Sequence, residues 1–206
     1  GDKYEETTCL FSAGTCFVRC DYDSVGIEIS QFLALKDFFD SCDGENWFES
    51  GGDYINWCTG TNTNSDCGVD IIHDPCTGDL WQTPATDDEI STWSYEYNAW
   101  VGLTCESEDA FALVLSEYNV GRHEPCSLDH FNLTALKFLN DLRLDRNSLS
   151  GDVPHWIGDL GHLELLDLSY NSLNGTIADN LANALVIEEI LLEHNSLQGT
   201  VPSSLS

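Results

Sequence analysis

Basic residues are scarce in this sequence. Only 7 of its 206 residues are Lys or Arg, against 36 that are Asp or Glu, and the formal net charge is −29. Repulsion from phosphate groups disfavours nucleic acid and anionic membrane surfaces as partners. The acidity has two interpretations, either a strongly solvated surface suited to a salty medium or a surface that docks a basic partner or divalent cations.

Long apolar runs are also missing. No stretch of the chain approaches the roughly 20 apolar residues that a helix needs to cross a bilayer, so we expect any membrane tether to lie in segments that this chain does not include. The sequence opens without an apolar leader, and it ends at Ser206 inside a repeat unit with no polar closing cap. A stack of repeats needs such a cap, and we therefore expect the native polypeptide to continue.

Recognisable catalytic motifs are absent too. The six histidines are scattered, and the sequence has no His-x-x-x-His pair, no Gly-x-Ser-x-Gly elbow and no phosphate-binding loop. Asp21 and Asp23 begin like a calcium loop, but Phe32 stands at the twelfth position, where a bidentate Glu is needed. The sequence thus predicts a protein that is not an enzyme, with no metal site and no cofactor.

The nine cysteines contain no Cys-x-x-Cys pair, and none of them lies in the regular repeats described below. Disulfides in an oxidising compartment are therefore favoured over a zinc site. The odd number leaves one thiol that is either free or paired with something outside this chain. Two sequons, at Asn132 and Asn174, are typical of extracellular or cell-surface proteins. The cysteines are Cys9, Cys16, Cys20, Cys42, Cys58, Cys67, Cys76, Cys105 and Cys126.

What the sequence does contain is a repeat. Asn147, Asn171 and Asn195 are separated by equal intervals (171 − 147 and 195 − 171), and several leucine, glycine and valine or isoleucine columns keep the same step. The shared spacing is LxxLxLxxNxLxGxVP, which is typical of a leucine-rich repeat. A unit of this length cannot bury its own apolar face, so it must stack on its neighbours in a solenoid.

Each unit predicts a short strand. Leu142 and Leu144 alternate with polar Arg143 and Asp145, so the leucines point to one side and the polar residues to the other. Parallel stacking would bury the leucines, at roughly 1.5 to 3 kcal/mol for each side chain. The repeat asparagine follows the strand, and its amide can satisfy backbone groups in neighbouring turns. We therefore predict a structural asparagine ladder.

The predicted fold class is an α/β solenoid, a right-handed leucine-rich repeat superhelix with short parallel strands on its concave face. An irregular unit comes first. Its Leu113 lies further from Leu142 (142 − 113) than one regular step, so the segment from Gly121 to His130 carries the extra residues. Residues 113–206 are expected to form about four units, with the last one truncated.

Residues 1–112 are expected to form an N-terminal cap stapled by disulfides. Apolar residues recur at helical spacing over about 30–41, which predicts one main helix with Ser30 able to cap its start. An acidic, cysteine-bearing insertion of about 53–97 follows. On the convex side of the repeats, Trp156 is predicted to pack under a turn rather than to bind a ligand.

The order of these segments resembles a known family. An Ala-Leu-containing helix, a Gly-x-x-Trp turn, a Trp-x-Gly-x-x-Cys segment at Trp100 to Cys105 and the repeats resemble the extracellular leucine-rich repeat domains of plant receptor kinases and of surface proteins in algae and other protists. The resemblance covers about residues 30–206. It implies a curved ectodomain that recognises peptides, proteins or glycans. Two cysteines flanking the tryptophan motif pair in that family, but here the long insertion intervenes, and the partner of Cys105 stays open.

Outward positions on successive strands predict the binding surface. Two of the few basic residues, Arg143 and Arg146, stand there amid acids, and Tyr170 and His194 add side chains of a kind enriched in recognition surfaces. The alternative is that the arginines only neutralise nearby aspartates. The predicted ligand-binding residues are Arg143, Asp145, Arg146, Asp167, Ser169, Tyr170, Leu191, Glu193 and His194.

The sequence therefore predicts a secreted or surface-anchored recognition module. It would be part of a receptor or adhesion protein and would bind a protein, peptide or glycan through the concave face or the acidic cap. Two alternatives stay open. One is a soluble inhibitor of secreted hydrolases, a role that plant relatives of this fold also fill, and the other is a structural wall or matrix protein without a saturable partner.

Overall fold

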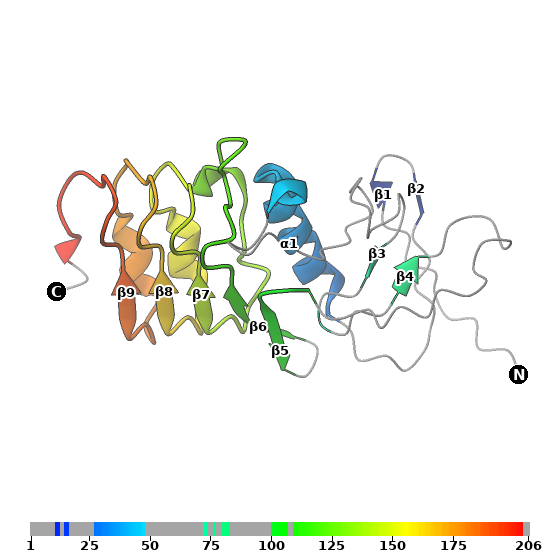
Figure 1. The fold of residues 1–206 in the computed structure, drawn as a ribbon. Coiled ribbons are helices and arrows are strands. Elements are labelled where there is room, and N and C mark those ends of the chain that lie inside the picture. Colours follow the sequence, from blue (N-terminus) through cyan, green and yellow to red (C-terminus); the bar gives the residue numbers. More distant parts are fainter. Residues whose placement is uncertain are drawn as a thin grey trace, which may run out of the picture.

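Four parallel strands, one from each repeat unit, form the sheet around which the rest of the chain is arranged (Figure 1). Leu113, Leu142, Leu166 and Ile190 occupy the same register position in the four strands. The predicted stack is confirmed, and the chain forms a leucine-rich repeat solenoid. The strands are β6 (Asp109–Val114), β7 (Asp141–Arg143), β8 (Leu165–Asp167) and β9 (Glu189–Leu191).

The structure is a computed structural model, and it describes residues 11–12, 15–16, 27–47, 72–73, 76, 80–82, 100–106 and 109–203. Most of the predicted acidic insertion lies outside these residues. The N-terminal segment holds two short antiparallel hairpins, and no helix within the described ranges is long and apolar enough to span a membrane. The hairpin strands are β1 (Phe11–Ser12), β2 (Thr15–Cys16), β3 (Ile72–His73) and β4 (Leu80–Gln82).

The repeat leucines form the core. Leu142, Leu144, Leu166 and Leu168 have no exposed surface, and each contributes roughly 1.5 to 3 kcal/mol by leaving water. On the other side of the first three units a short 3-10 turn closes the coil. Trp156 lies in one of these turns, is buried as predicted, and donates its Nε1–H to a carbonyl oxygen at 3.2 Å. The 3-10 turns are η1 (Gly44–Asn46) in the cap and η2 (Leu128–His130), η3 (His155–Asp159) and η4 (Asp179–Asn183) in the repeats.

The units are also joined by a second set of backbone bridges, outside the named strands, which the sequence did not predict. Ser127 and Ser150 form one isolated parallel bridge, and Val153 and Ile177 form another. The amide of Val153 donates to the carbonyl oxygen of Thr176 at 3.0 Å. The valine or isoleucine column of the repeat therefore supplies backbone pairing as well as apolar surface.

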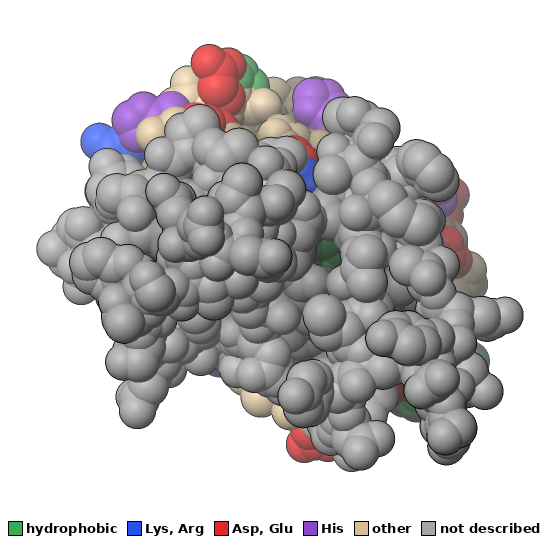
Figure 2. Space-filling view, turned by 90° about the vertical axis from the view of Figure 1, so that its right-hand side faces the viewer, with side chains coloured by type: hydrophobic (Ala, Val, Ile, Leu, Met, Phe, Trp, Pro, Cys, Tyr) green, Lys and Arg blue, Asp and Glu red, His purple; other side chains and the backbone are tan. Residues whose placement is uncertain are grey.

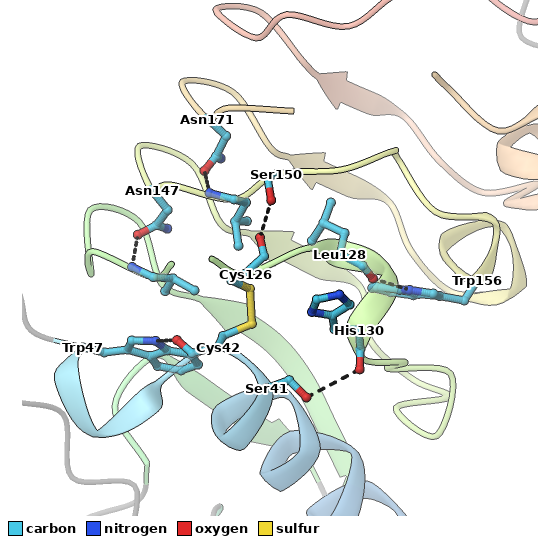
Figure 3. Close-up of a disulfide and its surroundings, with 12 residues drawn as sticks. Ser41, Cys42, Trp47, Cys126, Leu128, His130, Asn147, Ser150, Trp156 and Asn171 are labelled. Carbon is cyan, nitrogen blue, oxygen red and sulfur yellow. Dashed lines mark hydrogen bonds between the residues drawn. A yellow bond between two sulfur atoms is a disulfide. The ribbon is translucent and has the colours of Figure 1, made fainter. Parts of the chain in front are cut away.

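Each repeat asparagine joins two turns of the coil (Figure 3). The Nδ2 of Asn171 donates to the carbonyl oxygens of Leu144 in the preceding turn at 2.9 Å and of Leu168 in its own turn at 3.1 Å. Its Oδ1 accepts the backbone amide of Leu149 at 3.0 Å. The equivalent asparagines of the preceding and following units make the same bonds. These backbone groups have no hydrogen-bonding partner in the strand ladders. The asparagine side-chain amide supplies that partner.

The extra residues of the first unit connect the repeats to the cap. They form a loop that carries Cys126, which is disulfide-bonded to Cys42 at the end of the cap helix (Figure 3). Ser150 of the next unit donates its Oγ–H to the carbonyl oxygen of Cys126 at 3.1 Å. The irregular spacing thus places a cysteine where the helix can reach it.

The predicted cap helix is present as α1 (Ile29–Ser41). The expectation that Ser30 caps it is wrong, because the helix begins one residue earlier and the Ser30 Oγ instead donates to the Glu28 carboxylate at 3.3 Å. Gln31 is buried, and its Oε1 accepts the backbone amide of Ala110 at 2.9 Å. This bond fixes the first turn of the helix to β6.

Aromatic rings continue the core from the cap into the repeats. The Phe38 ring centroid lies 4.8 Å from that of Trp47 and 4.5 Å from that of Phe131. The Phe131 ring in turn lies 5.8 Å from that of Trp156 in η3. All four side chains are buried in one hydrophobic cluster. Cap and repeats therefore share a single core.

The cap also supplies an extra strand, β5 (Leu103–Glu106), which pairs antiparallel with β6. This β5–β6 hairpin covers the edge of the parallel sheet, where unpaired backbone groups would otherwise invite aggregation. Cys105 in β5 is disulfide-bonded to Cys76, so its partner comes from the insertion.

We predict that Asn171→Ala lowers the free energy of unfolding by about 1 to 3 kcal/mol, because the carbonyls of Leu144 and Leu168 and the amide of Leu149 lose their partner. Chemical denaturation would measure the loss. The matched control is Asn183→Ala at an exposed position, which should change stability by less than about 0.5 kcal/mol. Equal losses in the two variants would contradict the bridging role.

A second prediction concerns the disulfides. Mass mapping without reduction should recover peptides joined through Cys42–Cys126 and Cys76–Cys105. The first bridge closes a separation of 84 residues, so a variant with Cys42→Ser and Cys126→Ser should lose about 4 to 5 kcal/mol of stability by the chain-entropy estimate. If a thiol reagent labels all four cysteines of the folded protein, the disulfide-stapled cap is disproved.

Candidate recognition surface

The predicted ligand-binding residues lie together on the strand face, a name used here for the outward side chains of β6 to β9 and of the turns that follow these strands. Val114, Arg143, Asp167 and Leu191 pair in register and form one row across the sheet. The remaining predicted residues follow within three positions of each strand end. The structure therefore brings residues from four units onto one continuous surface.

Arg143 is held within the strand face. Its Nε–H donates to both carboxylate oxygens of Asp141, at 2.9 and 3.1 Å, and its Nη2 donates to Oδ2 at 2.8 Å. These hydrogen bonds raise the pKa of Arg143 above its usual value; burial opposes the shift, while the charges of Asp141, Asp167 and Asp145 add to it. The guanidinium thus remains charged and partly neutralises the surrounding acids.

Asp145 and Ser169 are less accessible than their outward positions suggest. Their exposed fractions are only 7% and 4%. Asp145 accepts a hydrogen bond from the Ser116 hydroxyl, and the Ser169 Oγ–H donates to Asp167 at 2.6 Å. Alternation along a strand predicts direction but not coverage by the neighbouring strand. These two side chains organise the strand face and present little surface to a ligand.

The turns that follow the strands carry a second, more exposed row, which we call the turn row: Glu117, Arg146, Tyr170 and His194. The Arg146 Nη1 lies 3.2 Å from the Glu117 carboxylate, and its guanidinium carbon lies 5.2 Å from the centroid of the Tyr170 ring. The rings of Tyr170 and His194 stack with centroids 4.1 Å apart and planes 23° apart. An acid, a cation, a phenol and an imidazole are thus in contact across four units.

All four residues of the turn row adopt the left-handed backbone conformation, with φ between 53° and 66°. Side chains with a Cβ cost roughly 1 to 2 kcal/mol there, and glycine or asparagine would suit the turn better. The turn nevertheless carries large side chains at every unit. Strain of this kind is often retained where the side chain has a function, which makes the turn row a candidate site.

The chemistry that the turn row offers is that of binding. It presents ion-pair, hydrogen-bond, cation-π and stacking contacts on an exposed surface. Within the described residues, no group of three or more His, Cys, Asp or Glu side chains could hold a metal ion.

Other predicted residues lie elsewhere. The sequon residues Asn132 and Asn174 are both exposed, and the Asn132 Oδ1 accepts the backbone amide of Thr134 at 2.8 Å. Their glycosylation stays a prediction. Cys16 belongs to β2. Four of the predicted disulfide cysteines lie outside the described residues, namely Cys9, Cys20, Cys58 and Cys67.

Sequence reasoning missed two features. The first is the left-handed backbone of the turn row, although a signal existed, because Arg146, Tyr170 and His194 each immediately precede a repeat asparagine. The second is a hollow beside the β5–β6 hairpin. Asn140 and Glu164 line it from equivalent positions of successive units. The spacing of the leucines gives no indication that the column of Asn140 and Glu164 lines a hollow.

Comparison with known proteins supports the repeat assignment. The Leucine Rich Repeat family model matches residues 138–160 and 162–184, and these two segments are leucine-rich repeats. No curated protein matches the chain. The leucine-rich repeat predicted from the sequence is thus confirmed for these two units.

Several solved structures are similar to this chain. The BIR2 ectodomain from Arabidopsis thaliana has 30% identity over 52% of this chain and 55% of its own length, with a TM-score of 0.46. The HAESA receptor kinase ectodomain from Arabidopsis, in complex with a peptide hormone, has 28% identity over 52% of this chain and 18% of its own, with a TM-score of 0.46. The SOBIR1 ectodomain from Arabidopsis thaliana has 18% identity over 87% of this chain and 74% of its own, with a TM-score of 0.49. The chain spans about half the length of the first and less than a fifth of the second.

A substitution can show whether the turn row stabilises the fold or serves recognition. Tyr170→Asn keeps a residue that tolerates the left-handed conformation, and relief of backbone strain should offset the lost stacking on His194. We expect the free energy of unfolding to change by less than about 1 kcal/mol, as measured by chemical denaturation. The core variant Leu173→Ala should lose about 2 to 5 kcal/mol. A similar loss in Tyr170→Asn would assign Tyr170 to the fold rather than to recognition.

Proposed function

We propose that this chain is an extracellular recognition module, part of a cell-surface receptor or adhesion protein, that binds a protein, peptide or glycan without catalysing a reaction. The strand face carries the binding surface, and the turn row is its most specific part. The fold supports this proposal because stacked repeats produce a long surface whose outward residues can vary without disturbing the core.

The observation that carries the proposal is the turn row. Arg146, Tyr170 and His194 belong to side-chain types that form energetic centres of interfaces or are able to hydrogen-bond and stack. They lie in contact with one another on the surface, with Tyr170 44% exposed. Each is held in a left-handed turn between a repeat leucine and a bridging asparagine. A partner would therefore meet a preorganised set of contacts, which reduces the entropy lost on binding.

The extracellular part of the proposal rests on the disulfides. Two bridges join described cysteines, one between α1 and the first unit and one between the insertion and β5. The first holds the cap to the repeats and the second lies within the cap, and such bridges persist in oxidising compartments. A cap that depends on them favours a secreted or surface location.

The charges of the strand face also limit which chemical classes of partner can bind there. Its charged groups are largely paired, as Arg143 is with Asp141 and Arg146 with Glu117. A ligand that docks there must replace or extend these pairs, so we expect one with both charged and aromatic or polar groups. Peptides and proteins meet that requirement directly, and they are the first partners to test.

The experiment is a selection followed by matched variants. A random peptide library displayed on phage is panned against the immobilised protein, and recovered peptides are titrated by calorimetry. Arg146→Glu should weaken a strand-face ligand at least about tenfold. Lys137→Glu makes the same charge reversal at an exposed residue outside the strand face, and it should change the affinity by less than about twofold.

The other outcomes are equally informative. Unchanged affinity in Arg146→Glu and in Tyr170→Asn for every recovered peptide would move the site away from the strand face. Stoichiometric inhibition of secreted hydrolases would favour the inhibitor alternative instead. Failure to recover any saturable ligand from peptide, protein and glycan libraries would favour a structural role.

A further inference from the structure

A hollow of about 540 Å³ lies at the opposite end of the strands from the turn row. It opens at the amino-terminal ends of β6, β7 and β8, beside the β5–β6 hairpin. Phe111, Asn140 and Glu164 line it from three successive units. Their backbones are joined by hydrogen bonds of 2.8 Å from Asn140 N to Phe111 O and from Glu164 N to Asn140 O. The hollow is thus built from the same rigid coil as the core.

Its walls are acidic on one side. Glu106 and Asp109 come from the hairpin, and Glu164 comes from the third unit. One oxygen of Asp109 accepts the side-chain amide of Gln31 at 2.5 Å. In the part of the chain that the structure describes, no hydrogen bond or ion pair engages the carboxylates of Glu106 and Glu164, and no Lys or Arg lines the hollow. Two carboxylates that have no counter-ion among the described residues therefore line one hollow.

Aromatic side chains form another part of the lining. Phe138 and His162 occupy the same column of neighbouring units, and their ring centroids lie 5.4 Å apart. Phe138 is 47% exposed, although a side chain of this size is usually covered in a folded protein. An exposed aromatic face beside acidic groups is the arrangement that receives organic cations.

We propose that this hollow binds the guanidinium group of an arginine side chain presented by a partner peptide. The flat guanidinium can stack on the ring of Phe138 while its N–H groups donate to the carboxylates of Glu106 and Glu164. Arginine fits better than lysine because it is more weakly hydrated, is planar and donates in a fork. The negative charge of the whole chain would also attract a basic segment to the hollow.

Acidic side chains are exposed at other positions as well, such as Glu124 and Asp159, and several acidic groups are visible at the margins of Figure 2. What distinguishes the hollow is the combination of a concave shape, two carboxylates without a partner among the described residues, and an exposed ring. A bare metal ion would not use the aromatic wall, and the described residues contain no metal-binding cluster. The guanidinium is the group that would use both walls.

This site goes beyond the function proposed above. The hollow lies where the strands begin, whereas the turn row lies after they end. A ligand could occupy one without touching the other. The two proposals can therefore fail independently.

The test uses two tripeptides that differ in charge alone. Acetyl-Gly-Arg-Gly-amide and its citrulline analogue, in which the guanidinium is replaced by a neutral urea, are titrated into isotope-labelled protein and followed by NMR at about 0.15 M salt. We expect saturable binding of the arginine peptide with Kd on the order of 1 mM and the largest amide shifts around Glu106, Asn140 and Glu164. The citrulline peptide should bind at least about tenfold more weakly.

Matched variants locate the site. Glu106→Gln combined with Glu164→Gln should weaken the arginine peptide at least about tenfold. Glu124→Gln combined with Asp159→Asn removes the same charge from exposed positions outside the hollow, and should change the affinity by less than about twofold. Phe138→Leu keeps an apolar side chain but removes the ring. We expect it to lower the affinity for the arginine peptide about threefold or more, which tests the stacking contact independently of the carboxylates.

Several results would overturn the proposal. These are equal binding of the arginine and citrulline peptides, equal losses in the two double variants, or no saturation below about 10 mM. Equal affinity for the corresponding lysine peptide would reject the guanidinium assignment. Melting curves of each variant would establish that the protein is folded in every titration.

Discussion

The constraint on which this structure depends is that no unit can bury its own leucines. Each turn covers the apolar side of the next, and the asparagine amide satisfies the backbone groups that the turn leaves without a strand partner. The two effects require each other, because burial would be offset by orphaned polar groups if the amide were absent. The stack is therefore cooperative along its length, and one side of it stays free to carry other chemistry.

The same constraint explains the cap. The first unit has no preceding turn, so α1 and β5 take that place. An aromatic cluster around Phe38 and Phe131 extends the core, β5 pairs the edge of the sheet, and the Cys42–Cys126 disulfide holds the helix to the first unit. The irregular spacing of that unit is thus part of the capping arrangement.

Periodicity predicted the fold well because a phase that is kept from one unit to the next reports burial directly. The parallel strands, the cap helix and the position of Trp156 all followed from it. The start of the helix did not, since a serine such as Ser30 can stand inside a first turn as well as before it. Nor did the burial of Asp145 and Ser169 or the hollow near Phe138, because each depends on contacts between units that have no signature within one unit. The left-handed turn row did have a signature, since Arg146, Tyr170 and His194 each directly precede a repeat asparagine. The Cys76–Cys105 pairing could not be predicted either, because it depends on where the insertion lies relative to β5.

Hydrogen exchange at the amides that have no strand partner tests the central claim most directly. The backbone amides of Leu149 and Leu173 donate to the side chains of Asn171 and Asn195, at 3.0 Å in both cases. If asparagine bridges hold the turns together, these two amides should be protected as strongly as amides within β7 and β8 and should exchange with them in one cooperative step. Exchange at the rate of exposed loop amides, while the strand amides stay protected, would contradict the account.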